Sequence, residues 1–318
     1  MKDILFIYNP NSGQQMIGDY MNWIINYLSS EGYLGSFYAT QESGDARKIV
    51  EKIGKNFEKI MVSGGDGTLD EVISGAVKAN ILPEISYVPT GSTNDFAKSL
   101  NISSDIKEAT QMAVNAKSKL VDVGKIDEKY FVYVAAFGTI SEVSFNTDQD
   151  LKNIFGRSAY VFEGLRKALP LQTMDSYHAE VFFDDEKIEG DFVHFMVTNS
   201  FSVGGFSNIL GNNVGLDDGI FELTIIKKPK SLTDLNKIVS ALSNKKENDM
   251  VILRQASSFR VKTDREVSWS LDGEYGGSSL DARIDILKKR ISIKTGLEDW
   301  KSLEMGYNIQ SAFTKTSK

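Results

Sequence analysis

The sequence contains no cysteine, and this absence excludes disulfide bonds, thiolate nucleophiles and zinc centres built on thiolates. Histidine is scarce as well, because only His178 and His194 are present and they lie far apart in the sequence. We interpret His194, within the apolar run DFVHFMV, as an ordinary strand residue. Acid–base chemistry in this chain therefore falls to carboxylates.

The sequence also lacks long apolar runs and an excess of positive charge. No run approaches the roughly 18 apolar residues of a membrane span, and the start MKDILFIYNPNSG lacks the features of a signal peptide, so we expect a cytoplasmic protein. A formal net charge of −7 argues against general nucleic-acid binding and against bulk attraction to an anionic bilayer. With 318 residues, 41% of them hydrophobic, the chain is long enough for about two domains.

The first part of the chain alternates short apolar runs with stretches of helical periodicity. The pattern predicts strands over 4–8, 36–39, 59–63 and 85–89, and helices over 16–30, 46–57 and 69–79. Strands separated by helices of this length favour a parallel sheet. We therefore predict a Rossmann-like α/β domain over residues 1–125.

The rest of the chain is mainly typical of strands. They are expected over 130–138, 178–185, 192–200, 220–228, 257–263, 266–273 and 290–295, with helices over 158–170 and 232–243. This composition predicts a mostly antiparallel β-sandwich domain over residues 126–296. We expect the tail, 297–318, to pack back on the first domain.

Three of the predicted parallel strands end in polar turns that contain glycine, over residues 9–13, 63–68 and 89–95. Ligands of open parallel sheets bind outside the carboxyl ends of the strands. These turns are therefore expected at one edge of the sheet, where a single site can use all three.

The central turn, SGGDGT, has the glycines of a phosphate-binding loop. Glycine lets backbone N–H groups approach a phosphate, and the following helix N-terminus favours negative charge. The string is neither a Walker loop nor a dinucleotide fingerprint, since no Gly-Lys-Ser/Thr follows and Asp70 replaces the third glycine. The alternative is a tight strand-to-helix turn without a ligand. Because no lysine is present to neutralise phosphate, we predict that Asp66 holds a magnesium ion there.

A second acid, Asp95, follows the neighbouring strand in VPTGSTNDF. The alternative interpretation is that Asn94 and Asp95 cap the helix that begins with FAKSL. Two acids on two glycine turns of one sheet edge favour the metal site.

Five motifs, NPNSG, GGDGTLDEV, PTGSTNDFA, LDDGIFEL and LDGEYGG, occur in this order over nearly the whole chain. Together they resemble the diacylglycerol kinase catalytic family, and most of all its soluble bacterial lipid kinases. The family also includes sphingosine and ceramide kinases. The resemblance implies two domains, an ATP site in the cleft and transfer of the γ-phosphate to a lipid hydroxyl.

The resemblance also implies roles for individual residues in the first domain. It implies a magnesium network around Asp66 and Asp95. At Asp70 the chain departs from the Asn of many relatives. The implied nucleotide contacts are Asn9, Pro10, Asn11, Ser12, Gly13, Thr40, Gly65, Asp66, Gly67, Thr68, Leu69, Asp70, Glu71 and Ser92.

In SLDGEYGGSS, the pair Asp272-Gly273 suits a type I′ hairpin turn, so a turn without catalytic function is one interpretation. The resemblance instead implies that Glu274 accepts the proton of the lipid hydroxyl, and that Asp272 assists it or binds metal. Phosphoryl transfer by positioning, with a carboxylate as proton acceptor, is chemically sound.

In NVGLDDGIFEL, spacing alone favours a polar turn before a strand, and the alternating ligands of an EF-hand are absent. The resemblance implies a second, structural magnesium ion held by Asp218 with the carbonyls of Gly215 and Ile220. Such mixed oxygen ligands suit a hard cation.

We therefore expect an ATP- and magnesium-dependent kinase that converts diacylglycerol into phosphatidic acid. The alternatives are a kinase for a sphingoid base or glycolipid, an NAD kinase, and a non-catalytic regulator that binds lipid or nucleotide. The lipid acceptor implies peripheral contact with the inner face of the membrane, for which the stretches 158–172 and 200–211 are candidates, with core packing or a solvated loop as the alternative. A homodimer is a further expectation, because symmetric pairs are the commonest oligomers.

Overall fold

A computed structural model of the chain describes residues 2–13, 17–92, 94–138, 174–199, 202–203, 206–207, 215–244 and 246–297. Contacts divide the chain into two units, Met1–Val121 with Lys289–Lys318, and Asp122–Lys288. The domain border expected at residue 125 falls within a strand, β5 (Lys117–Ile126). Residues 298–318 lie outside the described residues, so the expected packing of the tail stays a prediction.

The first unit contains parallel strands connected by helices. In chain order its elements are β1 (Lys2–Tyr8), α1 (Ile17–Ser30), β2 (Tyr33–Ala39), α2 (Asp45–Ile53), η1 (Gly54–Asn56), β3 (Lys59–Gly64), α3 (Asp66–Lys78), β4 (Glu84–Pro89), α4 (Asp95–Ser99) and α5 (Ile106–Asn115). The strands pair in the order β4-β3-β1-β2, and every pair is parallel. The end of β15 (Glu274–Thr295) adds a further parallel strand beside β4, through Ser292 and Ile293.

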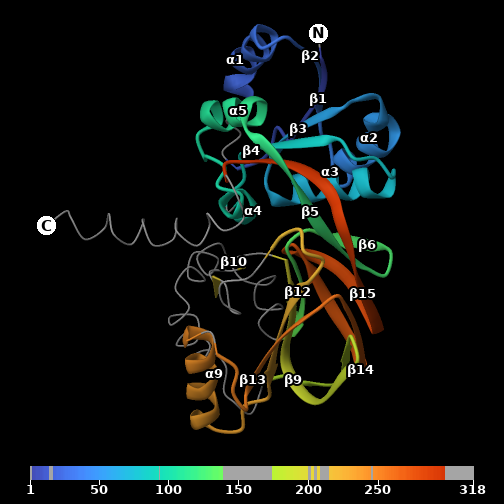
Figure 1. The fold of residues 1–318 in the computed structure, drawn as a ribbon, viewed down its shortest axis with the longest axis vertical. Coiled ribbons are helices and arrows are strands. Elements are labelled where there is room, and N and C mark those ends of the chain that lie inside the picture. Colours follow the sequence, from blue (N-terminus) through green and yellow to red (C-terminus); the bar gives the residue numbers. More distant parts are fainter. Residues whose placement is uncertain are drawn as a thin grey trace, which may run out of the picture. The chain divides into compact units, whose positions relative to one another are not determined.

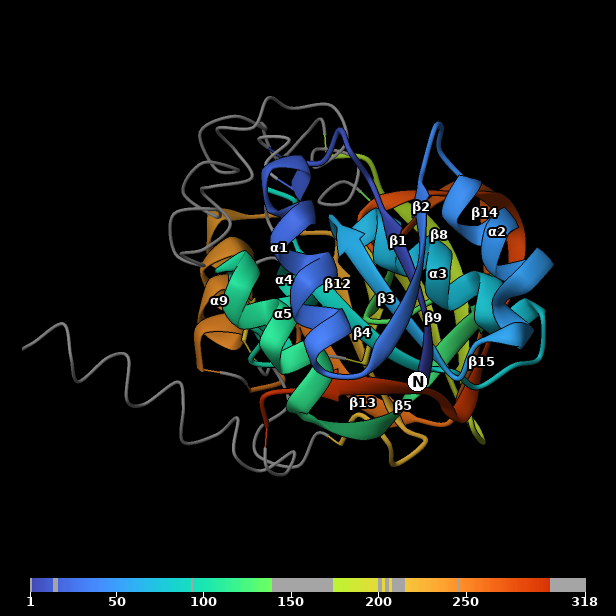
Figure 2. The same ribbon diagram turned by 90° about the horizontal axis from the view of Figure 1, so that it is seen from above.

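Helices cover both sides of these strands. Figure 2 shows α1 and α5 on one side of β1 and β3, and α2 and α3 on the other. Alternate strand residues such as Ile4 and Phe6 pack with Ile24 and Leu28 of α1 in one buried cluster. The apolar periodicity that predicted these elements thus corresponds to buried faces.

The sequence analysis missed α5. This helix is capped by Asp105, whose carboxylate accepts the N–H of Glu108 (2.9 Å), while the Ser103 hydroxyl accepts the N–H of Asp105 (3.1 Å) and donates to the Glu108 carboxylate (2.7 Å). The pattern Asp-x-x-Glu before an apolar stretch was the available signal.

The second unit is mostly antiparallel sheet. Its elements are β5, which enters from the first unit, β6 (Lys129–Phe131), β7 (Val134–Gly138), β8 (Tyr177–Phe183), β9 (Glu186–Thr198), β10 (Ser202–Val203), β11 (Phe206–Ser207), β12 (Phe221–Lys227), α9 (Leu232–Asn244), β13 (Val251–Ala256), β14 (Ser258–Leu271) and most of β15. Both β7 and β8 pair with β9 and with β14, so each fills part of the space between these two long strands. The expectation of a mixed α/β chain with mostly antiparallel sheet is confirmed.

Three strand predictions in this unit were wrong in detail. The strand expected over 130–138 is broken at Val132 and Tyr133, because their N–H groups bond to a carboxylate instead of a neighbouring strand. The two strands expected over 257–263 and 266–273 are one strand, β14, which pairs with β15 along most of its length (Figure 1). Strand β13 was missed, and the helix expected over 158–170 lies outside the described residues.

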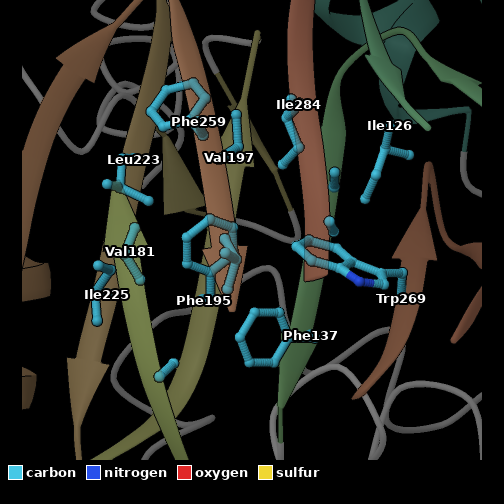
Figure 3. Close-up of a cluster of buried hydrophobic side chains, with 14 of the residues drawn as sticks. Ile126, Phe137, Val181, Phe195, Val197, Leu223, Ile225, Phe259, Trp269 and Ile284 are labelled. Atoms are coloured by element: carbon cyan, nitrogen blue, oxygen red, sulfur yellow. The ribbon is translucent and has the colours of Figure 1, made fainter. Parts of the chain in front are cut away.

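Aromatic side chains from several strands fill the core of the second unit, as Figure 3 shows. Phe137 of β7 stacks on Phe195 of β9 with ring centroids 5.1 Å apart, and Trp269 of β14 meets Phe137 edge to face at 5.0 Å. These contacts tie β7, β9 and β14 together, and β14 leads into the turn that carries the candidate catalytic motif.

Candidate active site

The polar loops of the first unit lie at one edge of its sheet, since they all follow parallel strands. Backbone hydrogen bonds connect them: the N–H of Asn9 donates to the carbonyl of Ser63 (2.8 Å), and the N–H of Thr40 donates to the carbonyl of Tyr8 (2.9 Å). The N–H groups of Thr90 and Gly91 both donate to the carbonyl of Gly64, at 2.8 and 3.1 Å. The structure thus brings together the loops that contain the predicted nucleotide contacts.

Glycine is required where these loops touch. A Cβ atom on Gly91 would lie 2.5 Å from Cα of Gly65, and one on Gly13, whose φ is +57°, would lie 2.1 Å from the carbonyl oxygen of Thr90. A side chain at either position would push the loops apart. At Gly65 itself a Cβ would meet the Cα of Gly91 at 3.5 Å, an ordinary van der Waals contact, so this position is packed less tightly than Gly13 and Gly91.

Two residues that the sequence analysis did not assign to this site hold the loops in place. The hydroxyl of Tyr87 lies 3.1 Å from both the Gly64 carbonyl and the side-chain oxygen of Asn94. Burial, and after it the nearby charge of Asp66, holds the pKa of Tyr87 well above its ordinary value. Asp66, in the first turn of α3, is therefore close to the contact between the β3 and β4 loops.

The capping interpretation of Asn94 was wrong. Asn94 occupies the N-cap position of α4, but its side chain makes no capping bond to that helix. Its amide instead accepts the N–H of Gly91 (3.1 Å) and donates to the carbonyl of Gly91 (2.7 Å). The side chain of Asp95 lies outside the described residues.

The other predicted contacts on α3 have structural partners of their own. The carboxylate of Glu71 accepts the N–H groups of Gly44 and Ala46, at 2.6 and 3.0 Å, and so caps the N-terminus of α2. The side chain of Leu69 is buried in the core, and Thr68 packs directly against Gly64. Asp70 lies one turn into the helix, whereas Pro10, Asn11, Ser12 and Ser92 lie in the loops.

In the second unit, Asp272 and Gly273 form the two-residue turn between β14 and β15. Their φ angles, 49° and 87°, are both positive and Leu271 pairs with Glu274, which are the features of a type I′ hairpin. The carboxylate of Asp272 is buried and accepts three backbone N–H groups, from Val132 (2.6 Å), Tyr133 (3.0 Å) and Val134 (2.8 Å). Glu274 follows the turn and is exposed.

The loop with the predicted second magnesium site is ordered by Asp218. Its carboxylate accepts the N–H groups of Gly215 (3.2 Å) and Ile220 (2.9 Å). The sequence analysis missed the fully buried Asp122 of β5, whose carboxylate accepts the N–H of Gly219 at 2.5 Å. An acid within the apolar run KLVDVG was the available signal.

The described part of the chain contains no group of three or more acidic, histidine or cysteine side chains arranged to hold a metal ion. Among the helices of those same residues, none is long and apolar enough to cross a membrane. Any magnesium ion here would thus depend on one or two carboxylates with carbonyl groups and water, a ligand set that magnesium accepts.

Comparisons with known proteins identify the family. The diacylglycerol kinase catalytic domain matches residues 3–126. A diacylglycerol kinase from Staphylococcus carnosus (strain TM300) is 32% identical over 302 residues, which are 94% of this chain and 96% of the relative. One from Bacillus subtilis (strain 168) is 31% identical over 280 residues, 87% of this chain and 91% of the relative.

The fold agrees with these relatives. A solved structure from Bacillus anthracis strain Sterne, of a protein assigned to the diacylglycerol kinases, superposes with a TM-score of 0.79. The two chains are 26% identical, and the match covers 93% of this chain and 95% of the other. The chain therefore belongs to the diacylglycerol kinase family and is a kinase.

Proposed function

We propose that the protein transfers the γ-phosphate of ATP to the hydroxyl of diacylglycerol and so makes phosphatidic acid. ATP use follows from membership of a kinase family. The observation that carries the proposal is the packing of the Gly13, Gly65 and Gly91 loops at the carboxyl ends of parallel strands. The choice of acceptor is supported by the names of the relatives.

In this proposal the first unit is a Rossmann-like nucleotide-binding domain and the second is a β-sandwich that binds the lipid. Backbone N–H groups at the start of α3 bind phosphate oxygens, aided by the positive end of the 13-residue helix. The other nucleotide contacts are the loop residues Asn9–Gly13, Thr40 and Ser92, and Gly67 to Glu71 of α3.

We propose magnesium as the second component of the nucleotide site, held by Asp66 and Asp95. The donor chemistry fits, because a carboxylate in the first turn of α3, close to the packed glycine loops, provides the oxygen ligand that the ion prefers. When bound, magnesium neutralises charge on the phosphates. The chain's own contribution is to hold the β3 and β4 loops together beside Asp66, through Tyr87 and Asn94.

Glu274 is the proposed proton acceptor for the lipid hydroxyl. It is exposed, so it is accessible to an acceptor, and it follows a rigid two-residue turn. As the hydroxyl oxygen attacks the γ-phosphorus, its proton passes to the Glu274 carboxylate and the bond between the γ-phosphorus and the bridging oxygen breaks, which leaves ADP. Asp272 contributes by holding the turn.

The loop from Gly215 to Ile220 is proposed to hold a structural magnesium ion. Its exposed carboxylate, Asp218, and the carbonyls of Gly215 and Ile220 are hard oxygen donors, so the residues fit such an ion. We also propose that the protein works at the surface of a membrane, because its lipid acceptor resides there. A homodimer is proposed because symmetric pairs are the commonest soluble oligomers.

The test is transfer of labelled γ-phosphate from ATP to diacylglycerol in mixed micelles, with magnesium. NAD and a sphingoid base serve as parallel acceptors, and magnesium is titrated for the wild type and for Asp66→Asn. We expect phosphatidic acid as the main product. We expect Glu274→Gln to lower kcat by about 10²- to 10⁴-fold without loss of ATP binding, since a positioned acid–base group contributes that much.

Each other outcome points elsewhere. Labelling of another acceptor would support a kinase with a substrate other than diacylglycerol. Near-normal turnover by Glu274→Gln would show that Glu274 is not the proton acceptor. An unchanged magnesium titration in Asp66→Asn would rule out the proposed metal ligand.

A further inference from the structure

Asp272 and the segment 132–134 form one compact structure, which we call the Asp272 clamp. Three successive N–H groups of the segment point at one carboxylate, with Val132 on Oδ2 and the next two residues on Oδ1. The N–H of Asp272 in turn donates to the carbonyl of Val134 at 2.9 Å. Hydrogen bonds of buried N–H groups to a charged acceptor are strong and costly to lose, so the clamp is rigid.

The clamp stabilises a backbone conformation that is unfavourable for most residues. Asp272 is not glycine, yet its φ is 49°, in the left-handed region. Such a conformation persists when surrounding contacts hold it, and here they hold it two residues before Glu274. The hairpin therefore has a defined geometry at the point from which the proposed base projects.

The side chain of Tyr133 also contributes to the Asp272 clamp. The hydroxyl of Tyr133 donates to the carbonyl of Asp272 at 2.9 Å, and the side chain is buried. Through this bond a side chain contacts the backbone of the turn itself. It restrains the peptide group that connects Asp272 to Gly273.

The other end of Tyr133 is anchored in the core. Its carbonyl accepts the N–H of Asn199 at 3.0 Å, and the amide of Asn199 donates to the carbonyl of Asp122 at 3.1 Å. Both Asn199 and Asp122 are fully buried. Asn199, which follows β9, thus connects the backbone of Tyr133 to β5. Because this backbone is fixed in the core, the Tyr133 hydroxyl can hold the turn in a fixed position.

We propose that Tyr133 is a positioning residue for the transfer reaction: its hydroxyl fixes the Asp272-Gly273 turn and thereby the position of Glu274. This inference rests on the proposed role of Glu274 as the proton acceptor. Tyr133 itself takes no part in proton transfer. Its contribution is the fixed placement of a carboxylate that must meet the lipid hydroxyl within hydrogen-bond distance.

The test begins with Tyr133→Phe in the full chain, which keeps the buried ring and removes only the hydroxyl. We expect kcat to fall about 10- to 100-fold, the cost of a small misplacement of a reacting group. The KM for ATP and the pH dependence of kcat should stay as in the wild type, because neither the nucleotide loops nor the base changes. A kcat within about twofold of the wild type would overturn the proposal, by the same reasoning.

A double-mutant cycle separates positioning from general damage. If Tyr133 acts through Glu274, adding Tyr133→Phe to Glu274→Gln causes no further loss of kcat, so the two effects are not additive. A full additional loss in the double variant would show that the tyrosine acts elsewhere and would overturn the inference. If Glu274→Gln alone has normal kcat, the proposed function of that residue fails first.

Tyr27→Phe is the matched control. The Tyr27 hydroxyl accepts a hydrogen bond from the side-chain amide of Asn115 at 2.9 Å in the first unit, away from any predicted site residue. We expect wild-type kcat in this variant. A loss equal to that of Tyr133→Phe would show that removal of any tyrosine hydroxyl has this effect, and would contradict the proposal.

Discussion

Glu222 of β12 is a buried acid that the proposed reaction does not use. Its side chain is 6% exposed, and the amide of Gln255 donates to it at 3.3 Å. Burial raises the pKa of Glu222 to about 8, and the negative charge of Asp218 adds to the shift. At neutral pH the folded protein therefore keeps this carboxyl protonated.

The raised pKa predicts that the folded protein loses stability as the pH rises. From the ordinary value of 4.5 up to about 8, the unfolded chain has lost this proton and the folded chain has kept it. Glu222→Gln, which stays neutral at every pH, should remove this penalty. At pH 8 we expect the variant to be more stable by on the order of 3 to 5 kcal/mol.

Chemical denaturation of both proteins at pH 5, 6.5 and 8 checks this prediction. The control is Glu266→Gln, because Glu266 lies exposed on β14. Equal pH dependence in wild type and Glu222→Gln would show that the carboxyl is ionised in the folded state.

Burial shifts the pKa of His194 in the opposite direction to that of Glu222. Burial on β9 lowers its pKa to about 4. The side chain is therefore neutral at physiological pH and is part of the core, which confirms its interpretation as an ordinary strand residue. A histidine within an apolar run was enough to predict this.

At the scale of secondary structure elements, the side chain of Glu71 in α3 caps the N-terminus of another helix, α2. The residue before this helix, Gly44, has a left-handed backbone and no side chain, so the carboxylate that caps α2 comes from α3. Acidic groups at helix N-termini are stabilising because the first N–H groups lack partners within the helix.

Removal of this cap predicts a loss of stability. In Glu71→Ala the N–H groups of Gly44 and Ala46 lose their acceptor, and we expect the free energy of unfolding to fall by about 1 to 3 kcal/mol. Thermal unfolding measures the change, with exposed Glu58→Ala as the control. The KM for ATP, measured in parallel, tests the predicted nucleotide contact: an unchanged KM would assign Glu71 to the cap alone.

Elements with strong periodicity could be predicted from the sequence, and those set by distant contacts could not. Helices α1 and α3 were expected because their apolar residues recur on one face. The break between β6 and β7 could not be predicted, since it depends on Asp272, which lies 140 residues from Val132 in the chain. For the same reason the sequence predicted the glycine loops but not Tyr87, whose role appears only when β3 and β4 lie side by side.

At the scale of the whole molecule, the chain leaves the first unit through β5 and returns to it through β15, and these two strands pair with each other. Glu84 of β4 contacts both of these strands. Its carboxylate contacts Lys59 of β3 (2.5 Å), Lys294 of β15 (3.4 Å) and the hydroxyl of Ser118 of β5. Burial by itself raises the pKa of Glu84, but the bonds from Lys59 and Ser118 and the charge of Lys294 outweigh it and hold the pKa below its ordinary value.

This lowered pKa predicts that Glu84 stabilises the fold above its ordinary pKa and that the contribution is lost as the pH falls through the folded pKa. Glu84→Gln leaves two partly buried lysines without their counter-charge. We expect a loss of about 1 to 3 kcal/mol at pH 7, a range that allows for partial exposure of the carboxylate. The loss should shrink at acidic pH, where the wild type is protonated too.

Denaturation curves at a series of pH values from 7 down to about 2, which pass below the lowered pKa, check this prediction. Glu42→Gln is the control, because Glu42 pairs with Lys48 at 2.8 Å on an exposed surface, where ion pairs contribute little. Equal effects of the two substitutions would show that Glu84 is no more than a surface pair.

The return of β15 to the side of β4 makes the second unit an insertion within the first, entered and left through neighbouring strands. Such an insertion can be exchanged as a whole, because β5 and β15, through which the chain enters and leaves it, pair with each other. The strand order β4-β3-β1-β2 of the first unit does not depend on the insertion. Under the proposed function, exchange of the second unit would therefore change the lipid-binding part and leave the nucleotide-binding part intact.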